Sequence, residues 1–381
     1  MKKILLSLKV LAVWVLIIVV SLEIFLWLYD PFHFHVQGRK IRLFPHQTTT
    51  VHHKYEAIRQ EPLITTNNLG FQGRDYEKGA DQFRIFAVGG STTACDLIAT
   101  PYTWPVALDS LVLQKHPQTW VNNAGFSGHT SFGHQILLED ILLGLQPDLI
   151  LLLAGANDRG LSNISIKDTY IFKPDRKSDQ YSWKGKIYFF FADNSKILGA
   201  LINLKRASAA RNNVWNYQGF FDTDSIQTIA PTPLAVRDSI LQKYEAVFIS
   251  EYKQRISRLV HTCLQNGVKP VLLSQPILYD TLADPVTGLN LAAIEVPFKM
   301  AEATGIQVEA VDGLTEKAVL DLHNRAVREV AMEKGVPFID LAAKMPKGFA
   351  WFYDPIHFTE EGCKEVARIV YEELEAQNLL P

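Results

Sequence analysis

Short apolar runs alternate with longer amphipathic stretches from residue 84 to the end of the chain. The runs have the length of strands, and the stretches between them repeat apolar positions with the period of a helix. This alternation is typical of a parallel sheet with covering helices. We therefore predict an α/β domain with a doubly wound parallel sheet of about five strands. The predicted strands are Arg84–Val88, Trp120–Asn123, Asp148–Leu153, Lys269–Ser274 and Pro337–Leu341, and the predicted helices lie at roughly 103–115, 133–145, 241–266, 317–334 and 360–377.

One interval interrupts this alternation. About 110 residues separate the third predicted strand from the fourth, where a single crossover helix needs far fewer. Within the interval lie an aromatic cluster at Tyr188–Phe191 and a basic pair at Lys205 and Arg206. We interpret residues 161–240 as a cap-like insertion over an active site. The alternative is a surface excursion that contacts neither substrate nor membrane.

The N-terminus contains an apolar run of 20 residues, Val10–Tyr29, interrupted only by Ser21 and Glu23. At ~1.5 Å per helical residue the run spans about 30 Å, the thickness of the hydrocarbon core of a bilayer. Lysines precede it, and Trp27 and Tyr29 fall where interfacial aromatics are expected. We predict a single-pass membrane anchor within residues 1–29, with the remaining residues on the extracytoplasmic side.

A cleaved signal peptide would also have a basic start and an apolar core. No Ala occurs between Val13 and Glu56, so no A-x-A cleavage site follows the core, and an uncleaved anchor is favoured. An acid at the centre of a bilayer costs roughly 3 kcal/mol. Because Glu23 lies in the last third of the run, we expect its carboxylate to lean toward the interface.

Residues 30–83 are polar and have no sustained apolar period. We interpret them as a membrane-proximal segment, a solvated loop or stalk, whose stretch Asn67–Arg74 packs against the first strand of the domain. Its histidines lack the spacing and the neighbouring carboxylates of a metal site, so no metal is expected. These histidines are His33, His35, His46, His52 and His53.

Composition narrows the classes of partner. The chain has 381 residues, of which 48% are hydrophobic and 20% charged, and its formal net charge is −2. This is a normal globular balance without a basic stripe, so we predict no nucleic-acid partner. Cys95, Cys263 and Cys363 form no CxxC pair, and we interpret them as packing residues. The oligomeric state is left open.

An acid and a base lie three residues apart in Asp354-Pro355-Ile356-His357, just before the last predicted helix. A serine nucleophile needs a base to accept its proton and a third group to hold that base in the right tautomer. Gly89-Gly90-Ser91 follows the first predicted strand, and its glycines permit a tight turn into a helix start that favours negative charge. We predict Ser91 as nucleophile, His357 as base and Asp354 as orienting acid. Each motif by itself also fits an ordinary turn or helix cap.

Two further loops follow the second and third predicted strands. Gly128 lies in Ser127-Gly128-His129-Thr130, and Asn157 lies in Gly155-Ala156-Asn157-Asp158. A glycine lets a backbone N–H approach an oxyanion closely, and an asparagine amide is a neutral donor. Loops at the carboxyl ends of parallel strands can converge on one site. We therefore predict an oxyanion hole formed by Gly128, Asn157 and the Ser91 N–H.

Together the four blocks resemble the SGNH, or GDSL-type, hydrolases, which are named for a Ser, a Gly, an Asn and a His. The resemblance covers roughly residues 84–158 and 268–377. It implies ester chemistry through an acyl-Ser91 intermediate, with neither metal nor cofactor. Gly90 departs from the pattern, since the family often has Asp there, and this difference bears on the hydrogen bonds of the turn. The insertion and the anchor are not part of the minimal fold.

These predictions divide the chain into an anchor at 1–29, a membrane-proximal segment at 30–83 and an SGNH hydrolase-like domain at 84–381 with a flavodoxin-like sheet. The favoured hypothesis is a membrane-anchored serine esterase or acylhydrolase that acts on an extracytoplasmic acyl ester of a glycan or lipid. An O-acyltransferase would use the same residues, because only the group that meets the acyl-enzyme differs. A non-enzymatic, glycan-binding envelope protein on the same fold is the other alternative.

Overall fold

The computed structural model describes residues 2–32, 34–38, 40–53, 55–77, 81–160, 183–213, 226–298 and 304–381. Residue contacts divide the chain into two compact units. One unit comprises Met1–Phe44 and Asp168–Val214, and the other comprises Pro45–Lys167 and Trp215–Pro381. The insertion predicted at residues 161–240 falls in part on 161–182 and 214–225, which lie outside the described residues. The domain boundaries expected from the sequence stay a prediction.

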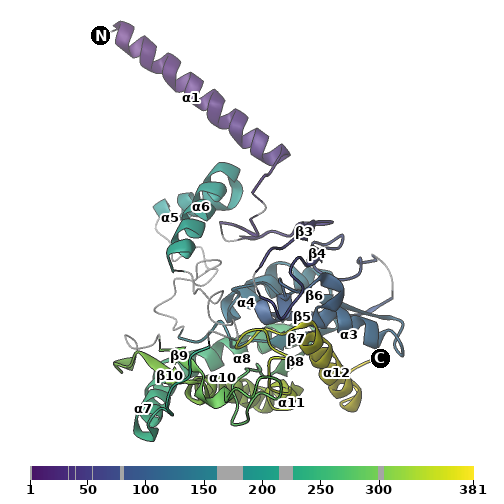
Figure 1. The fold of residues 1–381 in the computed structure, drawn as a ribbon. Coiled ribbons are helices and arrows are strands. Elements are labelled where there is room, and N and C mark those ends of the chain that lie inside the picture. Colours follow the sequence, from purple (N-terminus) through teal and green to yellow (C-terminus); the bar gives the residue numbers. More distant parts are fainter. Residues whose placement is uncertain are drawn as a thin grey trace. The chain divides into compact units, whose positions relative to one another are not determined.

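Parallel strands form the centre of the larger unit (Figure 1). Their order in the sheet is β11-β8-β7-β5-β6, so β5 lies between β6 and β7 although it precedes both in the chain. The strand order thus reverses at β5, the point where open α/β sheets bind ligands at the carboxyl ends of their strands. The strands are β5 (Phe83–Gly89), β6 (Thr119–Asn123), β7 (Leu149–Leu153), β8 (Lys269–Leu273) and β11 (Phe338–Ile339). The predicted five-strand, doubly wound sheet is confirmed.

Apolar side chains cover both faces of this sheet. Ile85 and Leu151 belong to a buried cluster with Trp104 and Leu108 of α3 and with residues of α12. The residues that alternate with them, such as Phe86, point to the other face and are also fully buried. Helix α8 contacts both α4 and α10 and packs against β8. Burial on both faces explains why the strands read as continuous apolar runs.

The helices of the larger unit mostly match the predicted stretches. They are α2 (Ser91–Ala94), α3 (Trp104–Val112), α4 (Ser131–Asp140), α7 (Leu234–Tyr244), α8 (Ser250–Gln265), α10 (Gly313–Lys334), α11 (Leu341–Lys344) and α12 (Glu360–Ala376), with a π-helical segment at Glu245–Ile249 and 3₁₀ turns at Thr100–Tyr102, Leu142–Leu145 and Leu291–Ala293. The predicted start at residue 241 is wrong, because helix begins at Leu234. Few of the added residues are buried, so the apolar period there is weak.

Two antiparallel hairpins in the larger unit were not predicted. They pair β3 (Thr48–Thr50) with β4 (Leu63–Thr65), and β9 (Glu295–Pro297) with β10 (Ala310–Asp312). Strands of three residues are too short to show a clear alternation of apolar and polar positions.

Residues 45–53 and 55–77 contribute to the core of the larger unit. Tyr55 and Ile58 belong to its main hydrophobic cluster, and Phe71 lies edge-on to Phe86 of β5 with ring centroids 5.9 Å apart. The expectation of a solvated loop or stalk is therefore wrong for Tyr55 and Ile58, whereas the predicted packing of Asn67–Arg74 against the first strand is confirmed at Phe71. Isolated apolar side chains can reach a core without any period in the sequence.

An ion pair between the exposed Arg74 and the buried Asp109 fixes the end of this segment. Arg74 donates from Nε and Nη2 to the two carboxylate oxygens of Asp109 in α3, at 2.5 and 2.9 Å. The same carboxylate accepts the N–H of Val121 in β6 at 2.8 Å. This charged contact therefore ties the segment to α3 and to the edge strand β6.

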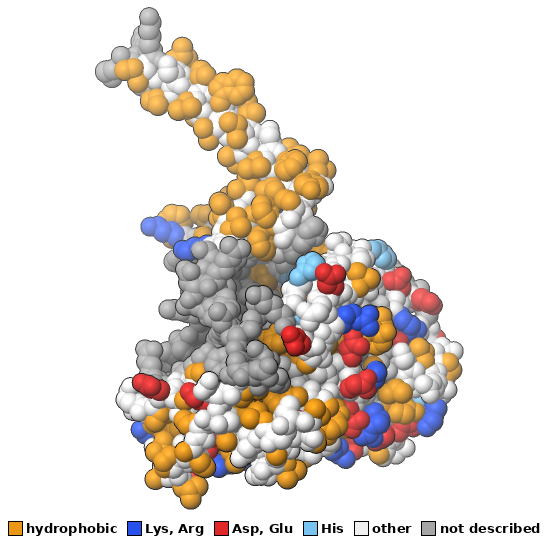
Figure 2. Space-filling view, in the orientation of Figure 1, with side chains coloured by type: hydrophobic (Ala, Val, Ile, Leu, Met, Phe, Trp, Pro, Cys, Tyr) orange, Lys and Arg blue, Asp and Glu red, His pale blue; other side chains and the backbone are white. Residues whose placement is uncertain are grey.

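The smaller unit contains the N-terminal helix and part of the predicted insertion. Its elements are α1 (Lys2–Leu28), the hairpin of β1 (Val36–Gln37) and β2 (Lys40–Ile41), α5 (Trp183–Asn194) and α6 (Lys196–Asn213). Helix α6 contacts α1, α5 and β1. The predicted N-terminal apolar run is confirmed as a helix. Apolar side chains are exposed along it (Figure 2).

Candidate active site

Ser91, His357 and Asp354 form one chain of hydrogen bonds. Nε2 of His357 lies 2.8 Å from Oγ of Ser91, and Nδ1 lies 2.6 Å from Oδ2 of Asp354. When the proton on Nδ1 is donated to the carboxylate, Nε2 is left to accept the proton of the serine hydroxyl. The structure therefore brings together three of the predicted site residues, although Ser91 and His357 are 266 positions apart.

The Asp354–His357 loop folds around its own carboxylate. Oδ1 of Asp354 accepts the N–H groups of Ile356 and His357 at 2.9 and 2.8 Å, a local turn typical of aspartate. Oδ2 is left for the imidazole. The ring of Tyr353 stacks on that of His357 at a centroid distance of 5.5 Å and an interplanar angle of 8°. The three-residue spacing thus fixes both the position and the plane of the imidazole.

Charges in this loop act in opposite directions on its two titratable groups. Burial alone would raise the pKa of Asp354, but the His357 charge and the N–H donors outweigh it and hold that pKa below its usual range. Burial alone would lower the pKa of His357, but the Asp354 carboxylate, with a smaller contribution from Asp96, raises it above its ordinary value. The imidazole is therefore a stronger base than it would be in water.

The turn before Ser91 needs glycine for steric reasons. A Cβ on Gly89 would lie 2.7 Å from the carbonyl oxygen of Leu153 in β7, and a Cβ on Gly90 would lie 2.5 Å from Nδ2 of Asn157. A backbone carbonyl cannot move aside, so Gly89 must lack a side chain, whereas a larger residue at position 90 would require the Asn157 side chain to shift. The departure from the family pattern at Gly90 thus leaves room for the Asn157 amide beside the turn.

Gly128 and Asn157 lie in the loops after β6 and β7. Gly128 has a φ of +77°, in the left-handed region that favours glycine. Nδ2 of Asn157 donates to the carbonyl of His129 at 3.0 Å, and both groups lie against Gly90, so the two loops meet beside the Ser91 turn. Among the described residues, the N–H groups of Ser91 and Gly128 donate to no protein acceptor.

A buried polar network behind these loops was not predicted. Asp158, which follows Asn157, accepts the hydroxyl of Ser131 at 2.5 Å and its backbone N–H at 3.1 Å. Arg255 of α8 donates from Nε to Ser131 Oγ at 2.8 Å and lies 3.5 Å from Asp158. Burial raises the pKa of Asp158, and Arg255 and Ser131 offset part of that rise. The network joins the start of α4 to the loop that contains Asn157.

The sequence offers only one signal for this network. Asp158 stands beside a predicted site residue, whereas Ser131 and Arg255 occupy ordinary positions in helices. Removing one member would leave a buried charge without its partner, which is strongly destabilising. We interpret these residues as positioning groups for the Asn157 loop.

Among the described residues, the side chains that could suggest a metal site do not gather into one. In the part of the chain that the structure describes, no three His, Cys, Asp or Glu side chains are placed to hold a metal ion. The three cysteines are free and buried, and Sγ of Cys95 lies 3.8 Å from Sγ of Cys363. Burial lowers the pKa of His134 and of His323 to about 3, so both are neutral at pH 7.

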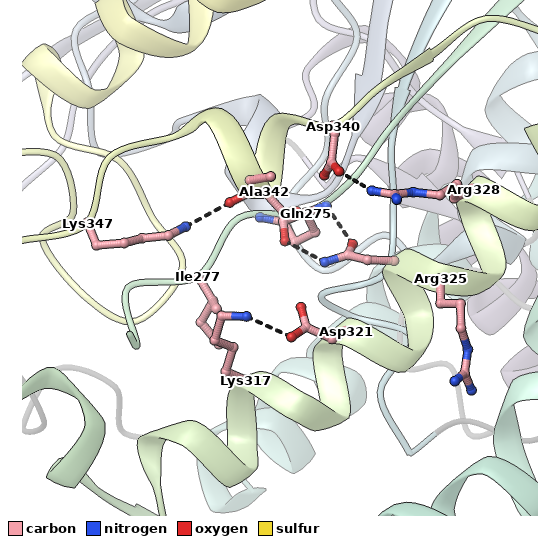
Figure 3. Close-up of a pocket in the computed structure, with 11 residues that line it drawn as sticks. Gln275, Ile277, Lys317, Asp321, Arg325, Arg328, Asp340, Ala342 and Lys347 are labelled. Atoms are coloured by element: carbon pink, nitrogen blue, oxygen red, sulfur yellow. Dashed lines mark hydrogen bonds and ion pairs between the residues drawn. The ribbon is translucent and has the colours of Figure 1, made fainter. Parts of the chain in front are cut away.

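A charged cavity of about 290 Å³ lies beside α10 (Figure 3). Gln275, which follows β8, forms part of its wall and accepts a hydrogen bond from the hydroxyl of Thr92 at 3.0 Å. Neither Ser91 nor His357 lines the cavity, so it adjoins the site without containing its reactive groups. Its charged lining residues are Lys317, Asp321, Arg325, Arg328, Asp340 and Lys347.

A model of the GDSL-like lipase/acylhydrolase family matches residues 87–364, which is more than half of the chain. All predicted site residues fall inside this range. No curated protein sequence matches the chain.

Solved structures resemble the chain at low identity. Axe2, an acetylxylan esterase from Geobacillus stearothermophilus, is 15% identical over 78% of this chain and 96% of its own, with a TM-score of 0.42. A putative lipolytic protein of the G-D-S-L family from Desulfitobacterium hafniense is 14% identical over 77% and 100%, with a TM-score of 0.38. A lipase/acylhydrolase from Enterococcus faecalis is 12% identical over 77% and 96%, with a TM-score of 0.39. At these values the likeness bears on neither substrate nor mechanism.

The charge of Asp354 sets the first testable expectation. Asp354→Asn should lower the pKa of His357 from its raised value, because the carboxylate that stabilises the imidazolium is lost. A pH titration of the His357 ring resonances by NMR measures this. Asp96→Asn is the control and should give a smaller decrease in the same direction. An unchanged His357 pKa in Asp354→Asn would contradict the assignment of the electrostatic partner.

Proposed function

The chain belongs to the GDSL-like lipase/acylhydrolase family and is an ester-hydrolysing enzyme, and we propose that it is a membrane-anchored serine esterase of an extracytoplasmic acyl ester. The substrate is an acylated glycan or lipid. The observation that carries the proposal is the hydrogen bond from Ser91 to His357, with Asp354 bound to the other ring nitrogen.

In the first half of the proposed reaction, His357 takes the proton of Ser91 as Oγ attacks the ester carbonyl carbon. Asp354 stabilises the imidazolium that forms, and its effect on the His357 pKa favours this step at neutral pH. The tetrahedral intermediate then collapses, the bond to the leaving oxygen breaks, and His357 returns its proton to the departing alcohol. The product on the enzyme is an acyl ester of Ser91.

In the second half, water attacks the acyl-serine while His357 accepts one of its protons. Collapse of the second tetrahedral intermediate releases the acid, and the proton passes from His357 to Ser91. Transfer of the acyl group to a hydroxyl acceptor would follow the same course, with that hydroxyl in the place of water.

Three donors are proposed to hold the negative oxygen of both intermediates. The N–H groups of Ser91 and Gly128 lack a protein acceptor among the described residues, and the amide of Asn157 lies against the turn that begins at Gly90. Fixed donors of this kind stabilise charge that develops in the transition state. The N-terminal end of α2 adds a favourable dipole, which is small because the helix has four residues.

Helix α1 is the proposed anchor. Its segment Leu6–Leu28 has 23 residues and a mean hydropathy of 2.7, and only 6% of its most apolar window is buried within the protein. An exposed apolar helix of this length satisfies the requirement for a single bilayer span. A signal sequence has the same properties, and the lack of an A-x-A site after the apolar run favours the uncleaved form.

Covalent labelling tests the nucleophile. A fluorophosphonate probe should label the full-length protein at Ser91, because such probes need a serine that is activated by a neighbouring base. Ser91→Ala and His357→Ala should lose at least ~99% of the labelling and of the turnover of a soluble ester. Ser127→Ala is the matched control, since Ser127 is an exposed serine near the site. Its hydroxyl donates a hydrogen bond to Asp96 rather than to a histidine. Persistent labelling in Ser91→Ala would remove the nucleophile assignment, and an unlabelled parent without ester turnover would favour a binding protein.

Loss of one oxyanion donor tests the role of Asn157. Asn157→Ala should lower kcat for ester hydrolysis by roughly 10²–10³ with little change in KM, because the donor acts in the transition state. Thermal unfolding of the variant should stay within a few degrees of the parent, since the lost bond to the His129 carbonyl is worth about 1 kcal/mol. Asn157→Asp keeps the size of the side chain but removes its donor, and should be at least as slow. A kcat equal to that of the parent would exclude Asn157 from the hole.

A further inference from the structure

A carboxylate near the end of the apolar helix caps a second helix. Glu23 of α1 accepts the backbone N–H groups of Lys196 and Ile197 at 2.5 and 3.1 Å and the hydroxyl of Ser195 at 2.9 Å. Lys196 and Ile197 begin α6, and the first N–H groups of a helix have no partner inside it. A negative charge at this end is also favoured by the helix dipole. Glu23 therefore joins α1 to the inserted helices.

Further contacts hold the same elements together. Nζ of Lys196 lies 3.3 Å from the carboxylate of Asp30 and 5.2 Å from the centre of the Trp27 ring. Nδ2 of Asn203 in α6 donates to the carbonyl of Val36 in β1 at 2.5 Å. Residues 23–32, 34–38, 40–41 and 183–213 thus form one small assembly, which we call the collar.

The collar begins where a bilayer would end. Residues 4–22 of α1 precede it, and at ~1.5 Å per residue they cover about 28 Å, close to one hydrocarbon thickness. From Glu23 onward protein covers part of the helix, and Leu26 is 8% exposed. A carboxylate with three donors is also tolerable at an interface, whereas it would be costly at the bilayer centre.

Helix α5 of the collar exposes an apolar face. Trp183, Ile187, Phe190 and Phe191 are each at least half exposed. Successive residues are about 100° apart around a helix, so these four positions share one face. Ala192, which is buried, points in roughly the opposite direction. The helix is therefore apolar on its packed side and on its open side, a distribution that is unfavourable in water.

Lysines border this face on both sides. Lys184 and Lys186 are exposed and lie at about 100° and 300° from Trp183, on either flank of the apolar stripe. Long cationic side chains can extend to lipid phosphates while an apolar face lies in the acyl boundary, and aromatic side chains favour the same depth. This pattern matches a lipid surface better than it matches a protein groove.

We propose that the exposed face of α5 lies in the interfacial region of the bilayer that α1 spans, and that the collar fixes it there through Glu23. The proposal rests on the membrane anchor proposed above and concerns only the smaller unit. The bilayer is the occupant because α5 is tied to the end of α1, whose own apolar side chains are exposed along its length (Figures 1 and 2). The inserted helices are thus a second membrane contact.

Depth measurements on the full-length chain test this. In four separate variants, one residue is replaced by cysteine and labelled with a nitroxide: Phe190, Ile187, Val15 or Glu361. Each variant is placed in nanodiscs of phosphatidylethanolamine and phosphatidylglycerol. The native cysteines are all buried, so the added thiols should react first. Collision rates with oxygen, which partitions into lipid, and with a water-soluble nickel chelate give the depth of each label. The oxygen-to-nickel ratio at Phe190→Cys and Ile187→Cys should be several-fold above that at Glu361→Cys on α12 and below that at Val15→Cys.

The outcomes separate the proposals. The oxygen-to-nickel ratios at positions 187 and 190 could equal the ratio at 361 while the label at 15 lies deep in the bilayer. That result would overturn the α5 contact and leave the anchor intact. A water-exposed label at 15 would overturn both. Spin–spin broadening at 190 that disappears on dilution with unlabelled protein would assign the face to a second copy and also overturn the bilayer contact. Turnover of a soluble ester in the same nanodiscs reports on the enzyme independently of every label.

Removal of the capping carboxylate tests the collar itself. In Glu23→Ala the amide hydrogens of Lys196 and Ile197 should exchange at least about fivefold faster, because the acceptor that protects them is lost. The label at Phe190 should move toward the aqueous ratio in the same variant. Ser21→Ala, an exposed polar position on the same helix, is the control and should change neither quantity. Unchanged exchange in Glu23→Ala would contradict the role of Glu23.

Discussion

The carboxyl ends of parallel strands lie at the same edge of a sheet, and the arrangement of the candidate active site depends on that constraint. Because β5 lies between β6 and β7, the loops after these three strands are neighbours, and they contain Ser91, Gly128 and Asn157. The loop before α12 brings Asp354 and His357 to the same place, with Nε2 of His357 2.8 Å from Oγ of Ser91. Loss of the strand order would separate groups that have no other reason to meet. The packing of helices on both faces of the sheet maintains this strand order, and it therefore also sets the geometry of the proposed active site.

Carboxylates are stabilised in different ways across the molecule. Asp354 has a histidine and two backbone N–H groups, and the result is a carboxylate with a lowered pKa and a more basic imidazole. Asp158 has Ser131 and Arg255, yet burial still raises its pKa. Glu23 of α1 accepts the first N–H groups of a helix. The partners of Asp354 lie in its own loop, whereas those of Asp158 and Glu23 belong to distant segments, so the latter two charges also hold segments together.

The larger elements of the fold could be predicted because their signals are local. Buried strands such as β7 are continuous apolar runs, and helices such as α12 begin at a cap like Thr359 that is visible in the sequence. The hairpin strands and the start of α7 could not be predicted, since their residues show little alternation or period. The burial of Tyr55 and Ile58 was missed for a related reason. These are isolated apolar side chains, and their burial depends on what they meet in space.

The sequence by itself determined which residues were candidates for chemistry, because a Gly-Gly-Ser turn, two loops at strand ends and an Asp-x-x-His spacing are recognisable from residue types and short distances along the chain. Only the tertiary structure decided how closely Asn157, which follows another strand, approaches Gly90. It also decided the partners of Asp158 and of Glu23. Contacts between segments that are far apart in the chain depend on how the elements pack, and no local pattern encodes that packing.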